Sequence, residues 1–135
     1  MAFVNAFMTE EEKAEFEVKA IPNPGNKLVT LKPYRWTIDR EQDVFLVWGL
    51  QEREEPHDEY FLLGWKGTPI NVKLREYWVS GAELGWELIR LELPAHLKDQ
   101  RDEIIKCLKD ALRVYGFNGN PNDQYNQAAK VHFKF

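Results

Sequence analysis

The most polar stretch of the chain, residues 52–59, combines five carboxylates with one imidazole, that of His57. Carboxylate and imidazole groups are ligands for divalent cations, so a metal site is one interpretation of this stretch. The stretch lacks the glycine and the alternating ligand spacing of a calcium loop, and acidic segments between strands are commonly solvated. We therefore expect a solvated loop here, and no metal or other cofactor.

General acid or base chemistry could come from His57, which is followed by Asp58, or from Glu52, Glu59 and His132. Adjacent residues of a loop or strand point in different directions, and no serine or cysteine lies near His57 to act as a nucleophile. Cys107 falls near the apolar face of a predicted helix, where a thiol is more often a small buried hydrophobe. The sequence thus favours a protein that is not an enzyme.

A short basic stripe lies at the end of the sequence, where Lys130, His132 and Lys134 alternate with apolar residues. Alternation of this kind predicts a strand whose basic side chains share one face. The stripe is typical of a solvated strand face, or of an edge that lysine protects from unwanted pairing. The more specific alternative is that the stripe is a surface that binds an anionic group.

Aromatic residues are more numerous than one modest sheet and one helix obviously require, with five Trp, five Tyr and eight Phe. Those in or beside predicted strands include Trp48, Trp65, Tyr77, Trp78 and Trp86. They could fill a large ordinary core, line a cavity inside a curled sheet, or form an interface with another chain. Together with His57 and His132, these five aromatic residues are our candidate binding residues.

Alternating and β-branched or aromatic residues predict five strands, and the basic stripe gives a sixth. The expected ranges are 28–38, 44–50, 60–65, 70–79, 86–93 and 130–135. The second of these is apolar at nearly every position, which predicts a central strand with both faces covered. Short links between neighbouring strands favour an antiparallel meander.

Two helices are expected, one before and one after the first five predicted strands in the sequence. Thr9 and Glu12 have the spacing of a capping box, which predicts a short helix over residues 10–20 with a narrow apolar face. Apolar residues recur at spacings of three, four and seven between Pro94 and Tyr115, and Gly116 follows them. This pattern predicts a long amphipathic helix that packs on one face of the sheet.

Length and composition limit the classes of protein to which this chain can belong. The 135 residues suit a single globular domain, and the net charge of −4 disfavours a protein that binds nucleic acid by neutralising phosphates. One cysteine gives no internal disulfide, no basic region precedes the first apolar residues, and no apolar run is long enough to cross a membrane. These features are typical of a small soluble cytoplasmic protein of bacterial type.

The sequence therefore predicts an α+β domain spanning residues 1–135. Its sheet is expected to have five or six strands in a mostly antiparallel meander, with the long helix on one face and a shorter N-terminal helix. We expect a non-catalytic binding or protein-interaction module whose partner is another protein or a second copy of the chain, with a homodimer as one form. The alternative is a small enzyme or small-ligand binder with a pocket in the concave face of the sheet.

Overall fold

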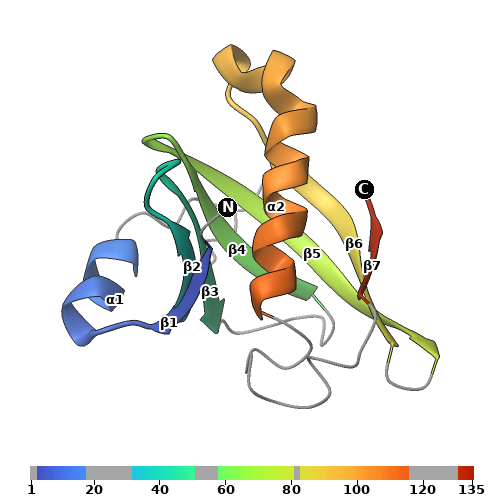
Figure 1. The fold of residues 1–135 in the computed structure, drawn as a ribbon, viewed down its shortest axis with the longest axis horizontal. Coiled ribbons are helices and arrows are strands. Elements are labelled where there is room, and N and C mark those ends of the chain that lie inside the picture. Colours follow the sequence, from blue (N-terminus) through green and yellow to red (C-terminus); the bar gives the residue numbers. More distant parts are fainter. Residues whose placement is uncertain (1–2, 18–31, 51–57, 81–82, 116–130) are drawn as a thin grey trace.

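The computed structural model describes residues 3–17, 32–50, 58–80, 83–115 and 131–135. Within these residues the backbone forms one seven-stranded sheet with the order β1-β2-β3-β4-β5-β6-β7 (Figure 1). Every neighbouring pair is antiparallel except the last, in which β7 runs parallel to β6. A parallel neighbour needs a crossover connection, and the long helix α2 lies between β6 and β7 in the chain.

The strands follow one another across the sheet in chain order. Their bounds are β1 Val4–Phe7, β2 Lys32–Asp39, β3 Val44–Leu50, β4 Asp58–Trp65, β5 Thr68–Ser80, β6 Glu83–Glu92 and β7 Val131–Lys134. The α+β class and the mostly antiparallel sheet predicted from the sequence are confirmed.

Short turns between strands set the register of the sheet. In the link from β4 to β5, Lys66 and Gly67 have φ angles of 49° and 89°. Positive φ at both central positions gives a type I′ turn, whose twist matches that of the flanking strands, and glycine adopts it without strain. In the link from β2 to β3, Asp39 Oδ1 accepts hydrogen bonds from the backbone N–H groups of Glu41 and Gln42, at 3.1 and 3.2 Å.

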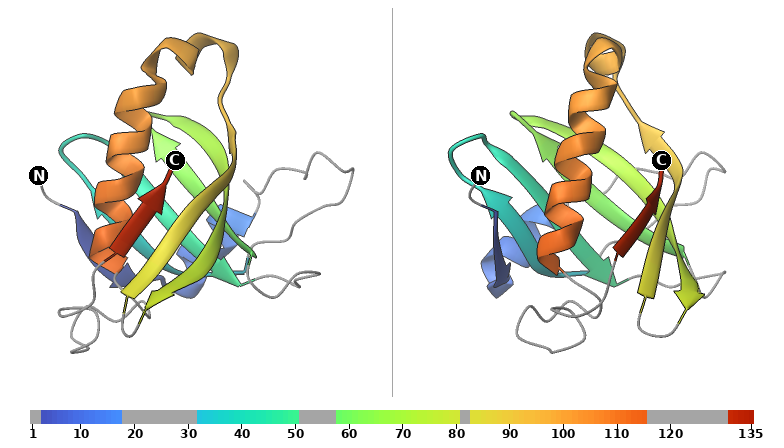
Figure 2. Two further views of the ribbon diagram at one scale, coloured as in Figure 1. Left: turned by 90° about the vertical axis from the view of Figure 1, so that its right-hand side faces the viewer. Right: turned by 45° about the vertical axis from the view of Figure 1, so that its right-hand side comes forward.

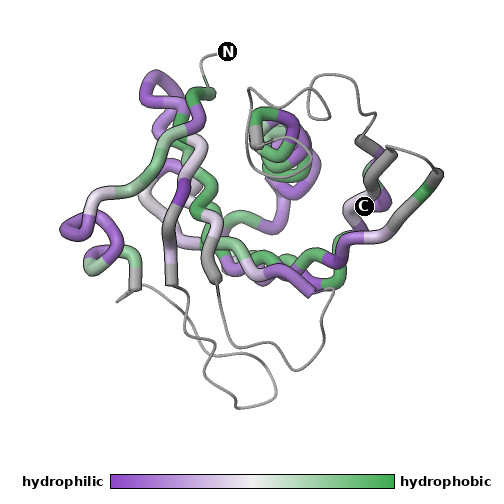
Figure 3. The backbone as a smooth tube through the Cα atoms, turned by 90° about the horizontal axis from the view of Figure 1, so that it is seen from below, coloured by the Kyte–Doolittle hydropathy of each residue, from purple (hydrophilic) through white to green (hydrophobic). Residues whose placement is uncertain are grey.

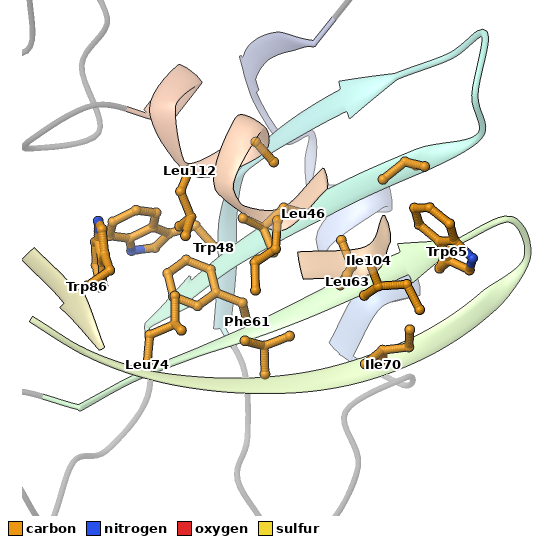
Figure 4. Packing of buried hydrophobic residues seen from close by; sticks show 14 of the residues in the cluster. Leu46, Trp48, Phe61, Leu63, Trp65, Ile70, Leu74, Trp86, Ile104 and Leu112 are labelled. Atoms are coloured by element: carbon orange, nitrogen blue, oxygen red, sulfur yellow. The ribbon is translucent and has the colours of Figure 1, made fainter. Parts of the chain in front are cut away.

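The sheet curves around α2 (Arg101–Tyr115), which follows the short 3-10 helix η1 (Ala95–Gln100) (Figures 2 and 3). We call the face that carries α2 the inner face. Alternate apolar residues of β3, β4 and β5 point from this face toward apolar residues of α2 that recur every three or four positions. Figure 4 labels these members of the inner cluster: Leu46, Trp48, Phe61, Leu63, Trp65, Ile70, Leu74, Trp86, Ile104 and Leu112.

The helix α1 (Glu10–Glu17) lies on the opposite side of the sheet, which we call the outer face (Figure 3). Thr9 and Glu12 form the expected capping box, in which each backbone N–H donates to the other residue's side chain, at 2.9 and 3.2 Å. Phe16 packs edge-on against Trp36 and Phe45, with ring centroids 5.8 and 5.0 Å apart. An outer cluster of Met8, Phe16, Val47 and Leu62 thus covers the second face of β3, as the doubly apolar strand required.

The strand count and the N-terminal helix differ from the sequence-based prediction. Seven strands are described where five or six were expected, because β1 was missed: four residues are too few to show alternation, and Asn5 and Ala6 have low strand propensity. The N-terminal helix follows β1 instead of opening the fold, and it is described over Glu10–Glu17, with residues 18–20 of the expected range outside the described part of the chain.

The prediction of a solvated loop at residues 52–59 is wrong for the last two of these residues. Asp58 and Glu59 begin β4, two residues before the predicted start of that strand, and both are buried. Residues 51–57, which include His57, lie outside the described residues. The expected 94–115 helix is divided into η1 and α2, because residues 95–100 adopt the tighter 3-10 form. No helix of the described segments is long and apolar enough to cross a membrane.

Candidate interaction surface

A row of four charged residues crosses the outer face of the sheet. Asp58 of β4 pairs with Arg75 of β5, Arg75 pairs with Glu87 of β6, and Glu87 pairs with Lys134 of β7. Residues directly opposite one another on neighbouring strands project from the same face, so the four side chains form one line of alternating sign. We call these four residues the charge row.

Asp58 is the buried end of the charge row, with 5% of its side chain exposed. Its Oδ1 accepts a hydrogen bond from Arg75 Nε at 2.9 Å, and its Oδ2 lies 3.1 Å from Lys73 Nζ. Burial lowers the pKa of the Lys73 amine, but hydrogen bonds to Asp58 and Tyr60 and their charges raise it more, so the net pKa is raised. Lys73 is therefore a fixed cation at neutral pH and is unsuited to act as a nucleophile or a base.

Lys134 is the exposed end of the row, and it covers an aromatic ring. Its Nζ lies 4.3 Å from the centroid of the Tyr77 ring. Tyr77 pairs with Gly85, and a Cβ atom on Gly85 would collide with the Tyr77 ring, so the glycine lets this ring lie across β6. His132 pairs with Gly85 from the other side and shares the outer face with Lys134.

The rest of the outer face between β4 and β6 is also polar. Lys73 lies between Tyr60 and Arg90 in the register of the three strands. In the neighbouring row, Asn71 Nδ2 donates to Glu92 Oε2 at 3.4 Å, and Arg90 Nε lies 3.2 Å from Glu92 Oε1. Among the described helices, α1 covers the outer face only near β2, β3 and β4 (Figure 3). The side chains of Lys73 and Arg90, on β5 and β6, are 17% and 25% exposed.

Three of the five candidate tryptophan and tyrosine residues lie inside the molecule. Trp48, Trp65 and Trp86 are 7%, 4% and 1% exposed, and all three point toward α2 (Figure 4). Trp48 and Trp86 pack edge-on against each other and against Phe61, with centroids 4.9 to 5.8 Å apart. Side chains of the core thus occupy the described inner face, and a binding role for these three residues stays a prediction.

The other candidate residues have different positions. Tyr77 and His132 lie together on the outer face, beside the charge row. Trp78 follows Tyr77 in β5, but its side chain is not among those described. His57 lies outside the described residues. Of the seven candidates, the structure thus places Tyr77 and His132 together on the outer face, and Trp48, Trp65 and Trp86 in the inner cluster.

Sequence reasoning missed the charged members of this surface, namely Lys73, Arg75 and Glu87. Their signal was visible, because Lys73 and Arg75 alternate with Val72 and Leu74, and Glu87 lies between Trp86 and Leu88. Alternation shows that they share a face within each strand, but it does not show which residues of neighbouring strands are opposite one another. The cross-strand row could not be seen without the register.

The described part of this surface offers ion pairs and aromatic rings, and its described residues include no combination of nucleophile and base. No three His, Cys, Asp or Glu side chains within the described segments are placed to hold a metal ion. Cys107 is half-buried on α2, where burial, Asp110, Asp39 and Glu103 raise the pKa of its thiol although Lys66 opposes them. Its thiol is therefore protonated near neutral pH, which disfavours nucleophilic chemistry.

Comparison of the chain with protein-family models, with curated proteins and with solved structures finds no match.

Proposed function

We propose that the protein is a non-catalytic protein-interaction module that binds with the outer face of β5, β6 and β7. The charge row, together with Tyr77 beside it, is the observation that carries this proposal. Arginine and tyrosine are enriched in the energetically important part of protein interfaces. The inner face is less suited to this role, because α2 and the inner cluster fill its described part.

The sign pattern of the row supports a protein partner. Nucleic acids and anionic membranes present one sign of charge and are bound by clusters of cations. Here Arg75 and Lys134 lie on either side of Glu87, so a run of phosphates along the row would meet a carboxylate between the two cations. A partner protein whose own charges alternate in sign would be complementary to the charge row. Electrostatic complementarity of this kind selects the partner and its orientation.

A second copy of the chain is the simplest partner of this kind. A two-fold axis that runs parallel to the strands, between the outer faces of the two copies and above the β5–β6 boundary, reverses the row of one copy over the row of the other. Arg75 of each copy then faces Glu87 of the other, which gives two contacts between opposite charges. The outer face is convex here (Figure 2), so the contact is centred on these two residues and the association is expected to be weak.

Charge reversal tests this arrangement through the solution mass, measured by light scattering over a dilution series. We expect Arg75→Glu and Glu87→Arg each to weaken dimer formation at least about tenfold, because two attractive pairs become repulsive. An equimolar mixture of the two variants should dimerise again, since each contact of the mixed pair joins opposite charges. The control is Glu103→Arg, which makes the same charge change as Glu87→Arg but on the exposed part of α2.

If the wild-type protein is a monomer at every concentration, the partner is a different protein and the same variants serve as baits. A partner captured by the wild type is then purified, and its Kd is measured for each bait. The proposal predicts a weaker Kd with Glu87→Arg and an unchanged Kd with Glu103→Arg. Equal Kd values for the wild type and both variants would refute the assignment of the outer face.

A further inference from the structure

The inner face of β2 is polar, unlike that of the neighbouring strand β3. Arg35, Thr37 and Asp39 alternate along the face that α2 covers, with exposed fractions of 8%, 0% and 1%. Asn5 of β1 lies directly opposite Thr37, and α2 packs on both strands. We call these four residues the polar seam. It continues the inner cluster toward the β1 edge of the sheet.

Two members of the polar seam have clear structural partners. Asp39 Oδ1 accepts the two backbone hydrogen bonds of the β2–β3 turn. The Arg35 guanidinium lies over the Phe7 ring, 4.3 Å from its centroid. The other two differ, because Thr37 Oγ1 and Asn5 Oδ1 are buried and have no hydrogen-bond partner within the described structure.

Two buried polar atoms without partners are unfavourable, because each has lost its hydrogen bonds to bulk water. Here they belong to side chains that face each other across two strands, where Cβ atoms are about 4.5 to 5.5 Å apart. A single water molecule can bridge two side-chain oxygens at such a separation. Asn5 Oδ1 only accepts hydrogen bonds, so the bridging group must be a donor.

We infer that the polar seam binds one water molecule, which donates a hydrogen bond to Asn5 Oδ1 and is hydrogen-bonded to Thr37 Oγ1. The bridge joins the edge strand β1 to β2 beneath α2. It matters for β1 because this strand contributes little apolar burial, with Val4 59% and Phe7 71% exposed. The water is thus a structural ligand that holds the edge of the sheet.

The substitution Thr37→Val tests this inference by the sign of its effect on stability. Valine keeps the shape of threonine but cannot hold the water. With a bridging water, the midpoint of urea unfolding should fall, because Asn5 Oδ1 and the water both lose a partner. In a dry seam the same change removes an unsatisfied hydroxyl group, so the midpoint should rise. A higher midpoint would overturn the inference.

A double-mutant cycle with Asn5→Ala makes the test specific to the pair. If one water joins the two side chains, the loss caused by both changes together should be smaller than the sum of the two single losses, because either change breaks the same bridge. Additive effects would show that the two atoms are not connected and would overturn the inference.

Two measurements identify the bound molecule. Nuclear Overhauser spectra of the wild type should show a long-lived water contact at the Thr37 amide, which Thr37→Ser keeps and Thr37→Val loses. This comparison holds even where the valine variant folds poorly, because the serine variant retains the hydroxyl group. Native mass spectrometry should give the mass of the polypeptide alone, and a bound organic molecule lost with Thr37→Val would overturn the assignment to water.

Discussion

At the scale of single residues, Asp58 shows how a buried carboxylate is held in a sheet. Its two cationic partners differ in exposure: 17% of the Lys73 side chain is exposed, and 41% of the Arg75 side chain. A hydrogen bond between charged groups away from water is stronger than the same pair at the surface, where solvent screens it. Lys73 is therefore the main stabilising partner of Asp58, and the more exposed Arg75 contributes less to holding it.

Substitution of Lys73 and of Arg75 should show how much each cation contributes to holding Asp58. We expect Lys73→Met to lower the free energy of unfolding by about 1.5 to 3 kcal/mol, because Asp58 loses its better-shielded partner. Arg75→Met should lower it by less than about 1 kcal/mol, as is usual for an exposed pair. Urea denaturation of both variants measures the difference, and a larger loss for Arg75→Met would contradict this assignment.

Cys107 carries a dependence of stability on pH. Its pKa in the folded protein is raised, first by burial and then by the carboxylates of Asp110, Asp39 and Glu103. A group whose pKa is raised on folding contributes stability that is fully present below the pKa of the unfolded chain, about 8.5 for a thiol. That stability is lost as the pH rises through the higher folded value, because the buried thiolate is disfavoured.

Two measurements check this behaviour of the thiol. At pH 8 the native protein should react with iodoacetamide more slowly than the urea-unfolded protein, since less thiolate is present and access is reduced. Above that pH the free energy of unfolding should decline more steeply for the wild type than for Cys107→Ala, which has no thiol to titrate. Equal alkylation rates in the two states would show that folding leaves this thiol unperturbed.

At the scale of elements, the pattern of apolar residues was enough to predict α2 and β3. The apolar residues of α2 repeat every three or four positions over fifteen residues, and those of β3 fill nearly every position, as a strand covered on both faces requires. β1 could not be found in the same way, since it gains its strand conformation from pairing with β2 and not from its own residues. Short edge strands depend on tertiary context.

The candidate site was less predictable than the fold. Tryptophan in a strand gives the same sequence pattern whether it faces a core or a partner, and Trp48 and Trp86 face the core. The charge row depends on register, which shifts within the β5–β6 pair: Lys73 is opposite Arg90, whereas Leu74 is opposite Leu88. One extra residue in β6 therefore decides which charges face one another, and no alternation within a single strand reveals it.

At the scale of the whole molecule, the sheet is shared by two hydrophobic clusters. Val44, Leu46 and Trp48 of β3 belong to the inner cluster, whereas Val47 belongs to the outer cluster with Leu62 of β4. The same backbone hydrogen bonds thus support both clusters, and neither can lose its packing without disturbing strands that the other needs. We expect the described parts of the chain to unfold in one cooperative step.

The substitution Leu62→Ala tests this coupling from the outer side of the sheet. Leu62 is fully buried, so the change should lower the free energy of unfolding by about 2 to 5 kcal/mol through lost apolar contact and the cavity left behind. The inner tryptophans should report the same lowered midpoint by fluorescence as circular dichroism reports for the backbone. Two separate transitions, with the inner tryptophans unfolding at the wild-type midpoint, would show instead that α2 and the inner face form a unit that is stable without the outer cluster.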